Sequence, residues 1–149
     1  MDTIASFEVD HNVLKPGIYL SRVDCGVRTY DLRVTRPNET FLPNAAMHTI
    51  EHLFAVRARN GAMGDKIIYF GPMGCRTGFY LLLIHATDAE AVSLIKDTFA
   101  FIASYEGKIP GTDPKECGNW REHDLAAAKE IAAEYGKVIA DWTAEGLSY

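Results

Sequence analysis

The chain lacks any apolar run long enough to cross a membrane. Its longest unbroken apolar stretch, residues 79–84, covers six positions, whereas a membrane-spanning helix needs about 20. The first residues also lack the basic start and apolar segment of a secretory signal, since Asp2, Glu8 and Asp10 stand there instead. These absences predict a cytoplasmic protein with no membrane partner.

The chain also lacks an excess of basic residues. Its 15 lysines and arginines are outnumbered by 20 aspartates and glutamates, which leaves a formal charge of -5. Because surfaces that coat nucleic acid or lie on membranes are ordinarily basic, we expect a small or neutral partner and no nucleic acid. The 12 glycines and 6 prolines are too few for a fibrous or linker-rich chain. A length of 149 residues predicts one domain, residues 1–149.

Cysteine is scarce, with Cys25, Cys75 and Cys117 as the three in the sequence. An odd and sparse set cannot form a disulfide framework, which indicates a reducing compartment and separate tasks for the individual thiols. Cys25 falls in a predicted turn between two strands, and we interpret it as structural.

Two kinds of apolar spacing alternate along the chain. Residues 29–35 show the period of two of a strand, which places Arg33 on its polar face. Residues 44–60 show helical spacing, and Asn44 stands where a cap would bind free backbone amides. Other strands are expected at residues 18–23, 66–70 and 78–85, and other helices from Asp88, as a cap, and from about Asp124.

The order of these elements predicts the fold class. Strands come in adjacent pairs with helices between and after them. The economical arrangement is therefore an antiparallel sheet with helices packed on one face, an α+β sandwich rather than a doubly wound parallel sheet.

The sharpest local motif is His48-Thr49-Ile50-Glu51-His52 inside the first predicted helix. His48 and His52 are one turn apart on one helix face, so their rings can bind a common metal ion, with Glu51 beside them as a base. The reversed order resembles the inverzincin motif. The alternative interpretation is an amphipathic helix with two solvated histidines.

A catalytic metal normally has three protein ligands and one open position. Cys117 lies in a loop just before the last predicted helix, where its thiolate could supply the third ligand. The alternative for Cys117 is an inert buried thiol.

Cys75 ends a glycine-rich connection between two predicted strands and is followed by Arg76. The positive charge of Arg76 would favour the thiolate, which suits a group that exchanges protons near neutral pH. A turn cysteine without a role is the alternative.

Four segments together resemble the LuxS family of S-ribosylhomocysteine lyases. They are His48–Phe54, Gly71–Tyr80, Glu116–Gly118 with His123–Leu125, and Ser6–Asn12. The resemblance implies an α+β homodimer with its active sites at the interface. It also implies that His48, His52 and Cys117 bind the metal and that Glu51 and Cys75 are the catalytic acid/base pair. Ser6, His11 and Arg33 would contact substrate across the interface.

The family cleaves S-ribosylhomocysteine to homocysteine and 4,5-dihydroxypentane-2,3-dione, the precursor of the quorum-sensing signal autoinducer-2. The resemblance implies one divalent metal per subunit, natively ferrous iron, which zinc or cobalt can replace. This chain departs from the family pattern at Tyr69, where aspartate is common, and at Gly71, where serine is more usual. Both departures concern polar contacts around the substrate.

Two other functions compete with this interpretation. An inverzincin peptidase would use Glu51 to activate a metal-bound water, but those enzymes are much longer and take their third ligand from a later glutamate. A structural metal module would close the coordination sphere with a fourth side chain, from His11, His85 or His123, and leave no open position.

Overall fold

The computed structural model describes residues 3–149, apart from the side chains of residues 5 and 6. At its centre is a four-stranded sheet of order β1-β2-β4-β3 in which every neighbouring pair is antiparallel. The strands are β1 (Gly17–Asp24), β2 (Val27–Arg33), β3 (Ile67–Pro72) and β4 (Gly78–Ile84).

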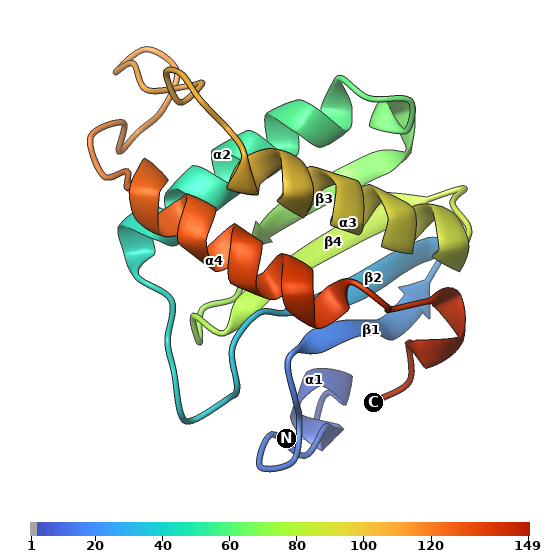
Figure 1. Cartoon of the computed structure of the whole chain (residues 1–149). Helices are drawn as coiled ribbons and strands as arrows, with labels where there is room; N and C mark the ends of the chain where they lie inside the picture. The colour runs from blue at the N-terminus through green and yellow to red at the C-terminus, as the bar shows by residue number, and fades with distance from the viewer. Residues whose placement is uncertain (1–2) are drawn as a thin grey trace.

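Three long helices cover one face of this sheet (Figure 1): α2 (Asn44–Arg59), α3 (Asp88–Ala103) and α4 (Leu125–Ile139). A short helix, α1 (Ala5–Glu8), precedes β1, and two 3-10 turns lie at Gly64–Lys66 and Ala144–Gly146. The predicted α+β fold, with an antiparallel sheet and helices on one face, is confirmed. Within residues 3–149, no helix is both long and apolar enough to cross a membrane.

The polar face of β2 is buried, which the alternating pattern did not predict. Tyr30 and Leu32 point into the core beneath the helices, as expected. Asp31 and Arg33 project from the other face, yet only 1% and 2% of their surfaces are exposed. The two side chains form an ion pair, which makes burial of both charges tolerable.

Two of the predicted helix caps are wrong. Pro43 precedes α2, and Asn44 is the first helical residue, with no cap bond from the residue before it. Helix α3 is capped by Thr87, which forms a reciprocal capping box with Glu90. Asp88 is thereby free to bind elsewhere, and its carboxylate accepts hydrogen bonds from Arg28 on β2. The predicted cap Asp124 is confirmed, since it accepts a bond from the amide of Ala127.

An aromatic cluster holds the helices to the sheet. Phe54 of α2 stacks on Phe70 of β3 with ring centroids 3.7 Å apart, and it meets Phe99 of α3 edge-on at 5.8 Å. Tyr135 of α4 is fully buried, and its hydroxyl donates to the carbonyl of Gly17 at the start of β1. These contacts fix α2, which carries the histidine motif, over the sheet.

Candidate active site and metal centre

The first turns of α2 present the histidine motif beside the long connection before α4. The rings of His48 and His52 lie edge to face, with centroids 4.5 Å apart. Nδ1 of His48 lies 2.9 Å from the carbonyl of Glu122, and Nδ1 of His52 lies 2.8 Å from that of Pro110. A carbonyl accepts and cannot donate, so each Nδ1 carries a proton, and in the neutral form of each ring the lone pair lies on Nε2. This is the tautomer that metal-binding histidines use.

His123 joins this pair from the end of the same connection. Its ring stacks on His48 at 4.0 Å and meets His52 at 4.8 Å. The hydroxyl of Thr49 gives its single proton to the carbonyl of Ala45. Nδ1 of His123, 3.1 Å from that hydroxyl, must therefore donate to it. Nε2 of His123 is left as a buried acceptor that has no hydrogen-bond partner among the described residues.

The arrangement fits a bound cation. Ligand atoms of His48, His52 and His123 lie within 4.8 Å of one another, and Sγ of Cys117 lies 3.4 Å from Nε2 of His48. Burial, followed by the charges of His48 and His52, lowers the pKa of His123 to about 4, which keeps that ring neutral. Neutral imidazoles with a thiolate are a donor set that suits zinc, cobalt or ferrous iron.

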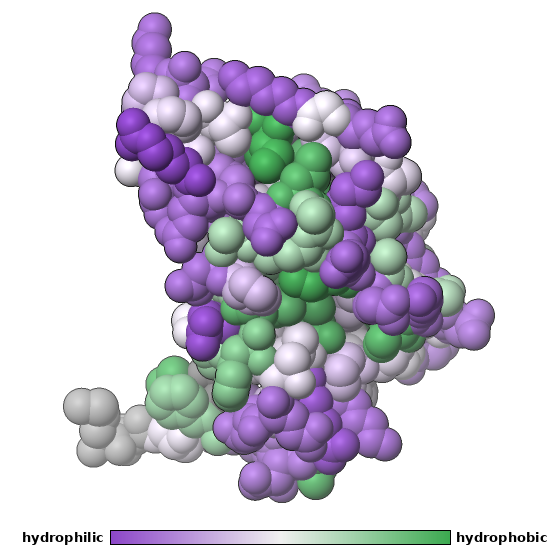
Figure 2. All heavy atoms as spheres, turned by 60° about the vertical axis from the view of Figure 1, so that its left-hand side comes forward, coloured by the Kyte–Doolittle hydropathy of each residue, from purple (hydrophilic) through white to green (hydrophobic). Residues whose placement is uncertain are grey.

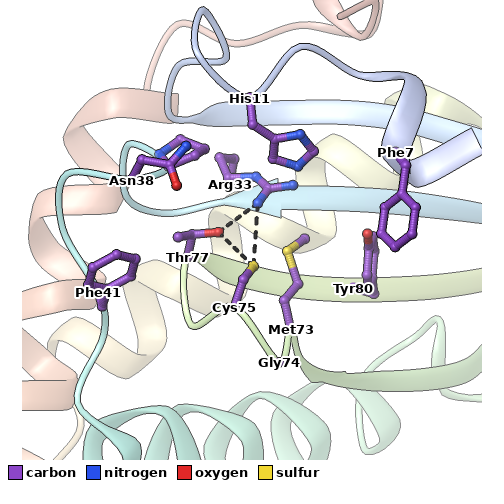
Figure 3. Close-up of a pocket in the computed structure, with 11 residues that line it drawn as sticks. Phe7, His11, Arg33, Asn38, Phe41, Met73, Gly74, Cys75, Thr77 and Tyr80 are labelled. Carbon is purple, nitrogen blue, oxygen red and sulfur yellow. Dashed lines mark hydrogen bonds between the residues drawn. The ribbon is translucent and has the colours of Figure 1, made fainter.

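Cys75 lies in a second group, a pocket of about 340 Å³ between β2 and the connection from β3 to β4 (Figure 3). Its sulfur is 3.1 Å from Oγ1 of Thr77. Nη1 of Arg33 donates to Thr77 at 2.6 Å and reaches Sγ of Cys75 at 3.9 Å. The cation beside this thiol is therefore Arg33, whereas the guanidinium of the predicted neighbour Arg76 lies over the ring of Phe41.

Arg33 is held in place by Asp31, two residues earlier on the same face of β2. Nε of Arg33 donates to Oδ1 at 3.1 Å and Nη2 donates to Oδ2 at 2.5 Å. Burial, the largest single effect, lowers the pKa of Arg33, but the charge of Asp31, its hydrogen bonds and smaller contributions from Cys75 and Tyr80 together raise that pKa above its ordinary value. The guanidinium is thus a permanent positive charge aimed at the thiol.

The predicted residues fall into two groups in the structure. His48, His52 and Cys117 lie together, and His11 and Arg33 line the pocket of Cys75. Glu51 is partly buried on α2 beside His52 and is not among the described residues that line that pocket. The Ser6 side chain lies outside the described residues.

Two residues beside the thiol, Thr77 and Asp31, were not predicted to act there. His123 was expected at the metal only as one of three possible fourth ligands of a structural module. The signal for Asp31 is present in the sequence, because opposite charges two positions apart on a strand share one face. Thr77 could not be found in this way, since its bond to Arg33 joins the β3–β4 connection to β2.

Residues 4–145 match the model of the family described as S-ribosylhomocysteinase (LuxS). A protein from Finegoldia magna named S-ribosylhomocysteine lyase is 46% identical over 155 residues, covering 100% of this chain and 99% of the relative. A protein of the same name from Desulfotalea psychrophila is 48% identical over 157 residues, with the same coverage. Another from Borreliella afzelii is 43% identical over 156 residues, again covering 100% and 99%.

Proposed function

This chain belongs to the S-ribosylhomocysteinase (LuxS) family, and we propose from that premise that it cleaves S-ribosylhomocysteine to L-homocysteine and 4,5-dihydroxypentane-2,3-dione. The observation that carries the proposal is that His48 and His52 meet on one helix face, with ring centroids 4.5 Å apart, and that Sγ of Cys117 lies 3.4 Å from Nε2 of His48. That donor set holds a divalent metal and leaves a position for substrate.

His48, His52 and Cys117 would hold the metal, and His123 would flank it. The ion supplies Lewis-acid stabilisation of negative charge on the sugar oxygens. We propose ferrous iron as the native ion, with zinc or cobalt as substitutes, because imidazole and thiolate bind all three. The preference for iron rests on the family resemblance.

Glu51 and Cys75 are the proposed acid/base pair. A thioether breaks by elimination only when an acidic C–H lies on the carbon next to the C–S carbon, so the sugar carbonyl must first move from C1 to C3. Each move removes a proton from one carbon and returns a proton to its neighbour. A proton then leaves C4, its electron pair forms a C4–C5 double bond, and the sulfur leaves C5 and is protonated to homocysteine. The enol left at C4 loses its hydroxyl proton and gains a proton at C5, which gives the dione. Arg33 favours the thiolate form of Cys75 that accepts such protons.

Ser6, His11 and Arg33 are the proposed substrate contacts. Nδ1 of His11 is 2.7 Å from the carbonyl of Val9 and so carries a proton, which leaves Nε2 as an acceptor at the pocket. Arg33 lines the same pocket. The role of Ser6 rests on the family resemblance alone.

We propose a cytoplasmic homodimer with the active sites at the interface, each copy forming one domain over residues 1–149. Large apolar side chains are exposed, among them Phe7 and Phe41, which both line the pocket of Cys75. Figure 2 shows apolar side chains gathered between hydrophilic rims on one face of the molecule. Arg33 contacts Cys75 within one chain. In the dimer, Arg33 and Cys75 of the same copy would therefore face the same bound substrate.

A structural metal module is the second candidate, and the unpartnered Nε2 of His123 favours it. Three imidazoles with Cys117 would close a tetrahedral site. Against this, His48 and His123 stack with an interplanar angle of 21° and centroids 4.0 Å apart, whereas two ligands of one tetrahedral ion splay apart. X-ray absorption of the zinc-loaded protein separates the candidates: two nitrogens, one sulfur and one oxygen support the lyase, and three nitrogens with one sulfur support the closed module.

Two variants test the proposed roles of Cys117 as a metal ligand and Cys75 as an acid/base group. Cys117→Ala should lose the metal, and therefore activity. Cys75→Ala should keep the metal and lose turnover, because only proton transfer is removed. Metal content and homocysteine release are measured on the same samples, and a fully active Cys75→Ala protein would contradict the assignment.

A further inference from the structure

The segment after α4 returns to the sheet beside β1 (Figure 1). The backbone N–H of Leu20 donates to the carbonyl of Leu147 at 2.8 Å. The ring of Tyr149 then stacks on Tyr19, with centroids 5.0 Å apart and an interplanar angle of 16°. These contacts bring the Tyr149 hydroxyl to the buried face of β2, where it donates a hydrogen bond of 2.9 Å to Oδ2 of Asp31.

Tyr149 completes the set of donors around a buried carboxylate. Arg33 supplies two donors to Asp31, and the tyrosine hydroxyl supplies a third. A carboxylate that is 1% exposed cannot turn to water for a replacement. Burial, and next the charge of Asp31, raise the pKa of Tyr149, so its hydroxyl stays protonated and remains a donor near neutral pH.

The guanidinium of Arg33 that binds Asp31 also contacts the thiol, because its Nη1 donates to Thr77 and to Cys75. We propose that Tyr149 is a positioning residue for the Cys75 thiol, acting through Asp31 and Arg33. This inference rests on the proposed acid/base role of Cys75. It adds a residue that is 74 positions away from Cys75 in the sequence and is not among the described residues that line the pocket of Cys75.

Removing the hydroxyl should weaken the hold of Arg33 on the thiol for two reasons. Asp31 loses a donor on Oδ2, so more of its negative charge acts on Arg33 and less positive charge acts on Cys75. The carboxylate also becomes free to rotate, which loosens the direction of Nη1. Both changes lower the fraction of Cys75 present as thiolate at a given pH, and thiolate is the form that alkylating reagents attack.

The test is alkylation of metal-loaded Tyr149→Phe protein by iodoacetamide near neutral pH. Phenylalanine keeps the ring stacked on Tyr19 and removes only the hydroxyl. Cys25, which is exposed in the β1–β2 turn, is an internal reference in the same molecule. We expect the Cys75-to-Cys25 ratio of labelling rates, read by peptide mass spectrometry, to fall about threefold. This is less than the full effect of losing one hydrogen bond to a charged group, because the change reaches Cys75 only through Asp31 and Arg33.

Tyr105→Phe is the matched control, because it also removes a phenolic hydrogen bond, to the carbonyl of Lys108, but far along the chain from Arg33. Its labelling ratio should equal that of the wild type. An unchanged labelling ratio in Tyr149→Phe overturns the positioning role. A second variant, Tyr149→Ala, also removes the ring, and a ratio that falls only in this variant would assign the effect to ring packing and likewise overturn the role of the hydroxyl. The assay uses no substrate, so an inactive protein whose ratio falls would contradict the lyase proposal alone.

Discussion

Sγ of Cys117 lies 3.4 Å from Nε2 of His48, although 69 positions separate the two residues. The long connection before α4 folds back over the first turns of α2 and makes this contact. Its backbone also orients the metal-facing rings, through the carbonyls of Glu122 and Pro110. The metal centre is therefore built from α2 and one loop, and changes in that loop should affect metal binding without touching a ligand.

Gly111→Ala should weaken metal binding. Gly111 has φ +74, and a Cβ there would meet Nδ1 of His52 at 2.8 Å. The ring must shift and lose its bond to Pro110, which should lower zinc affinity by about tenfold. Competition with a chromogenic chelator measures this. Gly136→Ala is the control, because its Cβ meets nothing within 4 Å, and equal affinities in the two variants would refute the role of the loop.

Thr49→Val should destabilise the protein more than Thr98→Val does. Both threonines are buried in helices and donate to a carbonyl four residues earlier. Thr49 alone also accepts bonds from the amide of Asp124 and from His123. Leaving those donors unpaired should cost about 1–3 kcal/mol beyond the Thr98→Val change. Urea unfolding of both metal-free variants measures this difference in the free energy of unfolding. Equal losses of stability would show that the Thr49 hydroxyl does not stabilise the contact between α2 and the residues just before α4.

Acid should remove the stability that Asp88 contributes. Burial alone would raise its pKa, but hydrogen bonds from Tyr30 and Arg28 outweigh this and hold the pKa below its ordinary value. A carboxyl with a lowered folded pKa stabilises the protein above its unfolded pKa of about 3.9, and that contribution is lost as pH falls through the folded value.

The free energy of unfolding of Asp88→Asn should accordingly lie about 1 kcal/mol below that of the wild type near pH 7, after allowance for partial exposure, with a smaller gap near pH 3. Glu134→Gln, which breaks an exposed ion pair with Lys137, is the comparison and should show little difference at either pH. If the difference in free energy of unfolding between wild type and Asp88→Asn grew larger in acid, the proposed stabilisation by the ionised carboxylate would be contradicted.

Periodicity predicted the elements of the fold because each depends on local spacing. The strands, the helices and the antiparallel order follow from residues such as Tyr30 and Leu32, which alternate, and Ile50 and Phe54, which lie on one helix face. The misplaced caps have a local cause as well. Thr87 competes with Asp88 for the start of α3, and its reciprocal bonds with Glu90 decide the outcome.

Local spacing showed the members of the site that share one segment, whereas Cys117 entered only through the need for a third ligand and the family resemblance. His48, Glu51 and His52 occupy adjacent turns, so the sequence shows them together. Arg33 beside Cys75 joins β2 to the connection before β4, and no local pattern contains that pairing. The neighbour in sequence, Arg76, was the only cation that local reasoning could offer.

Lyase activity is tested by incubating the anaerobically purified, iron- or cobalt-loaded protein with S-ribosylhomocysteine and measuring free thiol and diketone together. We expect one homocysteine thiol and one 4,5-dihydroxypentane-2,3-dione for each substrate consumed, and neither product after a chelator has removed the metal. Absence of thiol from the metal-loaded protein would contradict this expectation, as would release of homocysteine without the dione.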